Sequence, residues 1–316
     1  MTSPGENHSP IPDDSPSNPL SRTAFLKLEE IRRACLVADG ADPLDEATSL
    51  RMKYAGLGEH DRLHFSGDAG FLLALAADAT GPVALTLAVR PDAREQGRAG
   101  ALIDAYLVAR DTRTVSAWSH GNHPGATRLA QRWDFDRVRE LWVLRRALDG
   151  PVAAPAPPPD ITIRSYQPED AADLLATNAA AFAGHPEQGS MDAANLTQRM
   201  SEAWFDPAGL LVALDADGRM LGFHWTKQDP AITSTDGSPV GEVYVIGVAP
   251  RAHGRGLGRL LLQAGLHRLA DHGATEVVLY VESDNAPALR LYAALGFTHA
   301  HRDTHVHYQR RRPAAP

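Results

Sequence analysis

A glycine-rich, cationic segment in the second half of the chain has the residue types of an anion site. Three glycines spaced two residues apart are interleaved with arginines: Gly254, Gly256, Gly258, Arg251, Arg255 and Arg259. A strand-like run, Glu242 to Val248, precedes them and an amphipathic run follows. A turn between a strand and a helix points several backbone N–H groups at one position, with the helix dipole behind them. Because glycine lets a ligand approach the backbone closely, we predict a phosphate or pyrophosphate site.

A loop without any ligand is the alternative, because short glycine motifs match frequently by chance. The segment is not a Walker loop, since it lacks Gly-Lys-Ser/Thr. It is not a dinucleotide fingerprint either, because no early βαβ unit carries it.

The elements that must hold this turn occur twice along the chain. Residues 85–109 align with residues 243–270, so that Val89 matches Val248 and Gly97 matches Gly256. Residues 122–129 align in the same way with 285–291. We therefore predict a tandem duplication, with an α/β (α+β) fold in which each domain has a mixed, mostly antiparallel sheet flanked by helices.

Composition shifts set the predicted boundaries. They are a tail over 1–20, a first domain over 21–150, a Pro-rich linker over 151–160, a second domain over 161–310 and a tail over 311–316. Prolines make the linker a stiff, extended spacer that we expect to stay outside the packed core.

The motif of residues 248–258, with the later Asn285-Ala-Pro-Ala, Tyr292 and Gly296-Phe297, resembles the GCN5-related N-acetyltransferase (GNAT) superfamily. His253 stands where that family usually has Gln or Arg. The resemblance implies that acetyl-CoA contacts these residues: Ile246, Gly247, Val248, His253, Gly254, Arg255, Gly256, Leu257, Gly258, Arg259, Asn285, Ala286, Pro287, Ala288, Leu289 and Arg290. It also implies a second, non-catalytic CoA site formed by Leu87, Ala88, Val89, Arg94, Glu95, Gln96, Gly97, Arg98 and Ala99.

Acetyl transfer to an amine needs a base and a proton donor for the leaving thiolate. An α-amino group has a pKa of about 7.7–8, so a carboxylate helps to deprotonate it. Strand alternation places Glu242, Tyr244, Ile246 and Val248 on one face, which makes Glu242 the candidate base. Tyr292 is the candidate acid. Without the family resemblance, a surface glutamate and a core aromatic would be the preferred interpretations.

Matching the repeats places Val83 opposite Glu242 and Ala130 opposite Tyr292. The first copy has therefore lost both candidate groups. We predict a catalytic second domain and a degenerate first one.

Residues 185–189, 222–227, 241–248 and 279–285 also resemble the mycothiol synthase family of actinobacteria. That family acetylates the cysteinyl amine of desacetylmycothiol, a cysteine–glucosamine–inositol pseudodisaccharide. The resemblance implies that Glu242 is the base, that Tyr292 is the acid, and that the acceptor contacts Glu46, Glu187, Lys227, Glu242 and Tyr280. It also predicts a monomer.

Two other functions fit the residues. One is another tandem acetyltransferase, acting on an aminoglycoside or a protein N-terminus, although Lys227 argues mildly against the acidic cleft that an aminoglycoside enzyme needs. The other is a non-catalytic CoA-binding sensor, which Glu242 and Tyr292 disfavour.

The bulk composition of the 316 residues narrows the partners. A net charge of −8 argues against nucleic acid. With no apolar run long enough for a bilayer and no signal peptide in the first twenty residues, we expect a cytoplasmic protein without a membrane partner. The single cysteine, Cys35, excludes an internal disulfide, and a small buried hydrophobe is preferred over a reactive thiol. The alternating His299, His301, His305 and His307 could suggest a metal, but a solvated strand face is preferred and no metal is expected.

Overall fold

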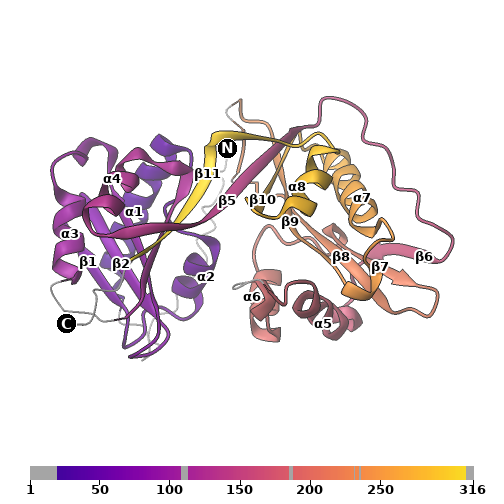
Figure 1. Ribbon diagram of the computed structural model, residues 1–316, viewed down its shortest axis with the longest axis horizontal. Coiled ribbons are helices and arrows are strands. Elements are labelled where there is room, and N and C mark those ends of the chain that lie inside the picture. The colour runs from indigo at the N-terminus through magenta and orange to yellow at the C-terminus, as the bar shows by residue number, and fades with distance from the viewer. Residues whose placement is uncertain (1–19, 108–112, 185–187, 231, 235, 311–316) are drawn as a thin grey trace, which may run out of the picture. The chain divides into compact units, whose positions relative to one another are not determined.

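The computed structural model describes residues 20–107, 113–184, 188–230, 232–234 and 236–310 (Figure 1). The chain forms two compact units, residues 1–141 with 301–316, and residues 142–300. These units do not end where the predicted domains end, because β5 (Phe135–Ala147) and β11 (Thr298–Arg310) each begin in one unit and finish in the other. Residues 142–150 thus belong to the second unit, and residues 301–310 belong to the first.

The first unit contains a mixed sheet in the order β1-β2-β3-β4-β11, in which β3 and β4 are parallel, whereas β1 with β2, β2 with β3 and β4 with β11 are antiparallel. Its strands, besides its parts of β5 and β11, are β1 (Arg62–Phe65), β2 (Gly70–Ala76), β3 (Val83–Val89) and β4 (Val115–Ser119). Its helices are α1 (Arg22–Asp39), α2 (Glu46–Tyr54), α3 (Arg98–Leu107) and α4 (Pro124–Arg132), with 3₁₀ turns η1 (Pro91–Ala93) and η2 (His120–Asn122).

The second unit has the order β5-β10-β9-β8-β7-β6, with β9 and β10 parallel and the pairs from β6 to β9 antiparallel. Its strands are β6 (Ile161–Ser165), β7 (Leu210–Asp215), β8 (Met220–Lys227), β9 (Val240–Val248) and β10 (Glu276–Glu282). Its helices are α5 (Ala171–Ala181), α6 (Ala193–Met200), α7 (Leu257–Asp271) and α8 (Ala286–Ala293). The 3₁₀ turns are η3 (Pro168–Asp170), η4 (Gln188–Ser190), η5 (Pro207–Gly209) and η6 (Pro250–Ala252).

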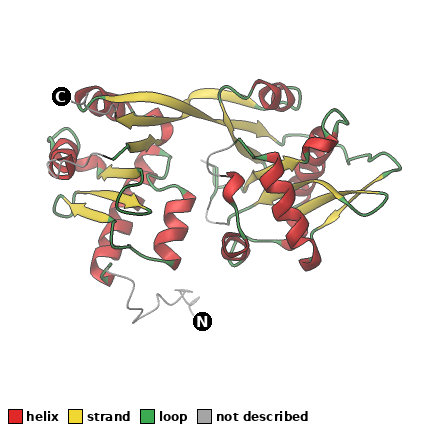
Figure 2. Ribbon diagram, turned by 60° about the horizontal axis from the view of Figure 1, so that its bottom comes forward, coloured by secondary structure: helices red, strands yellow, loops and turns green. Residues whose placement is uncertain are grey.

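Helices cover both faces of the second sheet, as the red helices around the yellow strands show (Figure 2). Leu174 of α5 and Leu196 of α6 pack on one face, in a cluster with Phe223 and Trp225 of β8. Helix α7 packs on the other face. The mixed, mostly antiparallel sheet with flanking helices is the predicted fold class, and it is confirmed.

The duplication is visible in the order of elements. The series β3-η1-α3-β4-α4-β5 of the first unit is repeated as β9-η6-α7-β10-α8-β11. The turn before the last strand is left-handed in both copies, at Asp134 (φ 59°) and Gly296 (φ 83°).

The Pro-rich linker is not wholly separate from the core. Val152 packs against the cluster that contains Leu262 and Leu266, and its carbonyl accepts a hydrogen bond from His267 Nδ1 at 3.1 Å. The prediction of a spacer outside the core is therefore wrong at Val152, whose apolar side chain gains from burial while the adjacent Pro151 stays exposed.

A glycine allows α7 to lie directly on β8. His224 is fully buried, and its Nδ1 donates to the carbonyl of Leu261 at 2.8 Å. A Cβ on Gly265 would overlap the imidazole ring of His224. This close approach fixes α7 on the sheet, and with it the glycine-rich turn at the start of the helix.

Candidate active site

The glycine-rich turn has the geometry of an anion site. After η6, the chain reverses through Gly254 (φ 77°) and Gly256 (φ 75°), and α7 begins at Leu257. Gly256 provides no side-chain cap, and no acidic residue lies in the first turn of α7. The N–H groups of that turn therefore lack intrahelical partners, and the positive end of the dipole is not compensated.

The three arginines of the turn differ in availability. Arg251 donates to the carbonyl of Met220, and Arg255 pairs with Asp160 at 2.6 Å. Arg259 is exposed and makes no ion pair within the described part of the chain. Of the three, Arg259 is therefore the cation most free to meet a bound anion.

His253 ties the turn to the preceding strand. Its Nε2 donates to the carbonyl of Val248 at 3.1 Å, and in the first unit Arg94 Nε donates to the carbonyl of Val89 at 3.0 Å. The two side chains make the same contact at matched positions. A histidine at position 253 therefore preserves the fold of the turn.

An opening between β9 and β10 begins next to this turn. The parallel ladder runs from the pair Glu276 and Val240 to the pair Leu279 and Val243, and then stops. Strand β9 continues to Val248 and β10 to Glu282 without further pairing to each other. Main-chain groups of β9 beyond Val243 can thus hydrogen-bond to the amides of an extended ligand.

A β-bulge at Tyr244 changes which face of the sheet the later β9 side chains occupy. Trp225 pairs with Val245 but the next residue, Thr226, pairs with Val243, so Tyr244 is an extra residue. Tyr244 and Val245 both pack on the α5–α6 side, whereas Ile246 and Val248 pack on the α7 side. The prediction that Glu242, Tyr244, Ile246 and Val248 share one face is therefore wrong, because the bulge reverses the alternation.

Three predicted acceptor residues do share a face. Lys227 lies opposite Glu242 in the antiparallel register, and its Nζ lies over the rings of Trp204 (4.6 Å) and Tyr244 (5.1 Å). Val278 lies opposite Glu242 in β10, so Tyr280, two residues further, points the same way. Glu242, Lys227 and Tyr280 thus come together on the α5–α6 side.

Two more residues were predicted to contact the acceptor, Glu187 and Glu46. Glu187 lies outside the described residues. Glu46 is the first residue of α2 in the first unit and follows Asp45, the N-cap of that helix.

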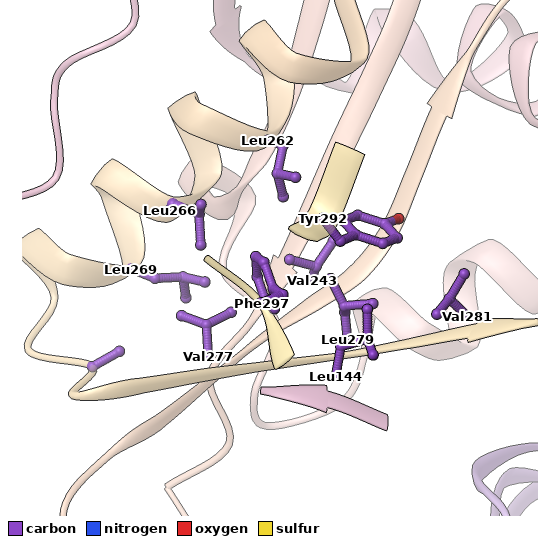
Figure 3. Close-up of a cluster of buried hydrophobic side chains, with 11 residues drawn as sticks. Leu144, Val243, Leu262, Leu266, Leu269, Val277, Leu279, Val281, Tyr292 and Phe297 are labelled. Atoms are coloured by element: carbon purple, nitrogen blue, oxygen red, sulfur yellow. The ribbon is translucent and has the colours of Figure 1, made fainter. Parts of the chain in front are cut away.

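Tyr292 lies on the α7 side of the opening (Figure 3), beside Val243 and Leu262 in the apolar cluster. It is 7% exposed and makes an edge contact with Phe297 at 5.8 Å. Burial raises the pKa of Tyr292 to about 12, so its hydroxyl carries its proton at neutral pH. Asn285 caps α8 by accepting a hydrogen bond from the N–H of Ala288 at 3.2 Å, which orients the helix that carries Tyr292.

The first unit lacks this arrangement. Strand β3 pairs with β2 without any register shift, so it has no bulge. Counting back from the matched valines without the bulge residue places Ala84, and not Val83, opposite Glu242. Val83 is buried, whereas Ala84 is exposed. Neither residue is a carboxylate, and the first unit therefore has no counterpart of Glu242.

The turn of the first unit also differs from that of the second. Glu95 (φ 60°) stands at the position of Gly254, so this turn carries a negative charge where the second unit has a glycine. Arg94 is engaged by Asp39 at 2.6 Å. Both features weaken the attraction of this turn for phosphate.

The histidines of β11 form ring contacts. His299 stacks on Trp142 at 4.3 Å, His307 stacks on Trp118 at 4.6 Å, and His305 meets His120 edge-on at 4.7 Å. The preferred prediction of a solvated face is therefore wrong for these three side chains, because aromatic neighbours cover them. No group of three or more metal-ligating side chains occurs among the residues that the structure describes.

Arg199 and Trp204 line the same face as Glu242 and were not predicted from the sequence. Trp204 meets Tyr244 edge-on at 4.9 Å, and the guanidinium of Arg199 lies 5.4 Å from the Tyr244 ring. The sequence signal that could have identified Trp204 is the aromatic pair Trp204-Phe205 just before a strand.

Residues 176–297 match the acetyltransferase (GNAT) family. The opened parallel ladder, the bulged strand and the glycine-rich turn, together with this match, define an N-acetyltransferase of the GNAT class. Two solved structures share the fold. A tandem GNAT protein from the clavulanic acid biosynthesis pathway has a TM-score of 0.68, is 20% identical and covers 95% of this chain and 99% of its own. A GCN5-related N-acetyltransferase from Sphaerobacter thermophilus has a TM-score of 0.66, is 23% identical and covers 92% and 93%.

Closer relatives extend over nearly the whole chain. A mycothiol acetyltransferase of a Nocardioides species is 48% identical over 292 residues, which is 89% of this chain and 96% of the relative. A mycothiol acetyltransferase of Salinispora arenicola is 46% identical, with 89% and 91% covered. The chain belongs to the mycothiol acetyltransferase family. In the described ranges, no helix is both long enough and apolar enough to span a bilayer.

Proposed function

We propose that the second unit transfers the acetyl group of acetyl-CoA to the cysteinyl amine of desacetylmycothiol. The observation that carries the proposal is the shared face of Glu242, Lys227 and Tyr280 beside the opening between β9 and β10. The names of the relatives support mycothiol biosynthesis as the setting.

The binding of acetyl-CoA follows from the turn and the opening. The unpaired N–H groups at the start of α7 hold the pyrophosphate, and Arg259 adds positive charge. The main chain of β9 beyond Val243 hydrogen-bonds to the amides of the pantetheine arm. The thioester then lies at the end of the paired ladder, between the face of Glu242 and the face of Tyr292.

The reaction needs a proton to leave the amine and another to reach the sulfur. Glu242 accepts the proton of the amine, directly or through a water molecule, and the free amine then forms the C–N bond. As the C–S bond breaks, Tyr292 donates a hydrogen bond to the departing sulfur. The pKa of Tyr292 is about 12, against about 8.5 for a thiol, so Tyr292 keeps its proton. It stabilises the thiolate through this hydrogen bond. After the C–N bond has formed, the nitrogen loses its surplus proton through Glu242 to solvent, and the thiolate takes one up from solvent, so that the net transfer moves one proton from nitrogen to sulfur.

The test is mass spectrometry of the protein incubated with acetyl-CoA and desacetylmycothiol. Fragmentation must locate the acetyl group, because the acceptor carries both an amine and a thiol. We expect N-acetylated product from the wild type, and a rate about 10²- to 10⁴-fold lower from Glu242→Gln. Glu169→Gln, which removes an exposed carboxylate of the same unit, is the matched control and should keep the wild-type rate. S-acetylated product, or no product from protein that binds acetyl-CoA, contradicts the proposal.

A further inference from the structure

The face on which Glu242 lies depends on the β9 bulge. Glu242 and Tyr244 are separated by Val243, which packs in the α7-side cluster. Beyond Tyr244 the alternation reverses, so Val245 instead of Ile246 faces the α5–α6 side. If Tyr244 rejoined the regular ladder, the pairing of Glu242 with Lys227 would shift by one residue. The side chain of Tyr244 therefore has to be held in place for Glu242 to point at the acceptor.

Two aromatic rings pack against the ring of Tyr244. Trp204 and Trp225 meet the ring edge-on at 4.9 Å and 5.4 Å. Phe205 in turn packs edge-on against Trp225 at 5.6 Å. Ring contacts of this kind fix the plane of the tyrosine ring, but its hydroxyl group still needs a hydrogen-bond partner.

Arg199 supplies that partner from α6. Its Nη1 donates a hydrogen bond to Tyr244 Oη, and its guanidinium lies 5.4 Å from the ring centroid. Its Nε donates to Asn195 Oδ1, one turn earlier on the same helix, at 2.8 Å. Arg199 is half-buried, and these contacts fix the orientation of its guanidinium.

We propose that Arg199 is a positioning residue for acetyl transfer: it anchors Tyr244, stabilises the β9 bulge and so aims Glu242 at the acceptor amine. The inference rests on the proposed role of Glu242. Arg199 acts through Tyr244 and not on the reacting atoms, so its removal displaces the base. The turn that binds acetyl-CoA lies beyond the other end of β9 and should be unaffected.

The experiment measures kcat/KM for the acceptor, the Kd for acetyl-CoA and the Tm for six variants. These are Arg199→Ala, Arg199→Lys, Tyr244→Phe, Glu242→Gln, Arg199→Ala with Glu242→Gln, and the control Gln198→Ala on the same turn of α6. Misplacing a catalytic group by about 1 Å costs roughly 10²-fold, and we expect a loss of this size in Arg199→Ala with an unchanged Kd for acetyl-CoA. Arg199→Lys, which keeps a cationic donor, should recover part of the loss, and Gln198→Ala should match the wild type.

The combination with Glu242→Gln separates positioning from general support of the fold. If Arg199 acts through Glu242, the double variant should be no slower than Glu242→Gln alone. In that case Arg199→Ala only displaces a carboxylate that Glu242→Gln has already removed. A further drop in the double variant, or equal weakening of acetyl-CoA binding, overturns the inference. If Arg199→Ala does not fold, Tyr244→Phe decides: full activity overturns the inference, and an acceptor-specific loss supports it. A normal rate for Glu242→Gln alone would instead overturn the proposed function.

Discussion

Protonation of His224 should limit the stability of the second unit in mild acid. The ring is fully buried against Gly265, its Nδ1 donates to Leu261, and its Nε2 has no hydrogen-bond partner among the described residues. Burial, only partly offset by the bond to Leu261, lowers the pKa of His224 from 6.5 to about 4. The folded chain therefore keeps this imidazole neutral where the unfolded chain would charge it.

The sign and size of the effect follow from the two pKa values. Above pH 6.5 both states leave His224 neutral, and the group contributes nothing to the pH dependence. Below pH 6.5 the unfolded state binds a proton that the folded state does not, so the free energy of unfolding falls as the pH falls. At 1.36 kcal/mol per pH unit, the loss is about 2 kcal/mol at pH 5 and about 3 kcal/mol at pH 4.

His224→Asn is the matched variant, because an asparagine amide can donate to Leu261 without titrating. Denaturant unfolding of both proteins, followed by tryptophan fluorescence between pH 7.5 and pH 4.5, gives the difference. The wild type should lose about 2 kcal/mol more than the variant on going from pH 6.5 to pH 5. Imidazole ¹⁵N spectra should show His224 in the neutral Nδ1–H form at pH 5. Parallel pH profiles for the two proteins, or a charged His224 at pH 5, would refute the reasoning.

Three further predictions concern single side chains. Gly265→Ala should lower the free energy of unfolding by about 1–3 kcal/mol through overlap with His224, and adding His224→Ala should restore part of it in thermal unfolding. Tyr292→Phe should lower kcat about 10²-fold while the Tm stays near the wild type, because the ring packing is kept; an unchanged kcat would remove Tyr292 from the mechanism. Arg259→Ala should raise the Kd for acetyl-CoA roughly tenfold by calorimetry, as expected for the loss of a charge-assisted hydrogen bond, whereas Arg219→Ala should leave it unchanged.

The turn was predictable from sequence because local rules decide it. Proline at the start of η6 and glycine where φ is positive determine the path from Val248 to Leu257, and the structure has Gly254 and Gly256 at φ values near 75°. The duplication and the mixed sheet were predictable in the same way, since repeated spacing and hydrophobic periodicity are properties of the chain itself.

The face of the sheet on which each β9 side chain lies was not predictable from the sequence, because it depends on pairing with another strand. Nothing within residues 240–248 marks Tyr244 as an extra residue; the bulge exists only relative to Trp225 and Thr226 of β8. The acceptor-side residues Glu242 and Lys227 were nonetheless named, since the family resemblance does not depend on the register. Arg199 was missed, because its function depends on a contact that spans 45 residues.

The long strands β5 and β11 explain why neither repeat can simply be lost. Residues 142–147, encoded at the end of the first repeat, lie next to β10, where Arg145 pairs with Glu276 at 2.7 Å. Residues 306–309, encoded at the end of the second repeat, pair with β4. A deletion of either repeat would remove the strand that it contributes to the other unit's sheet and would leave an open sheet edge, which favours aggregation. Selection for folding alone can thus retain both halves of the gene, whatever chemistry each half performs.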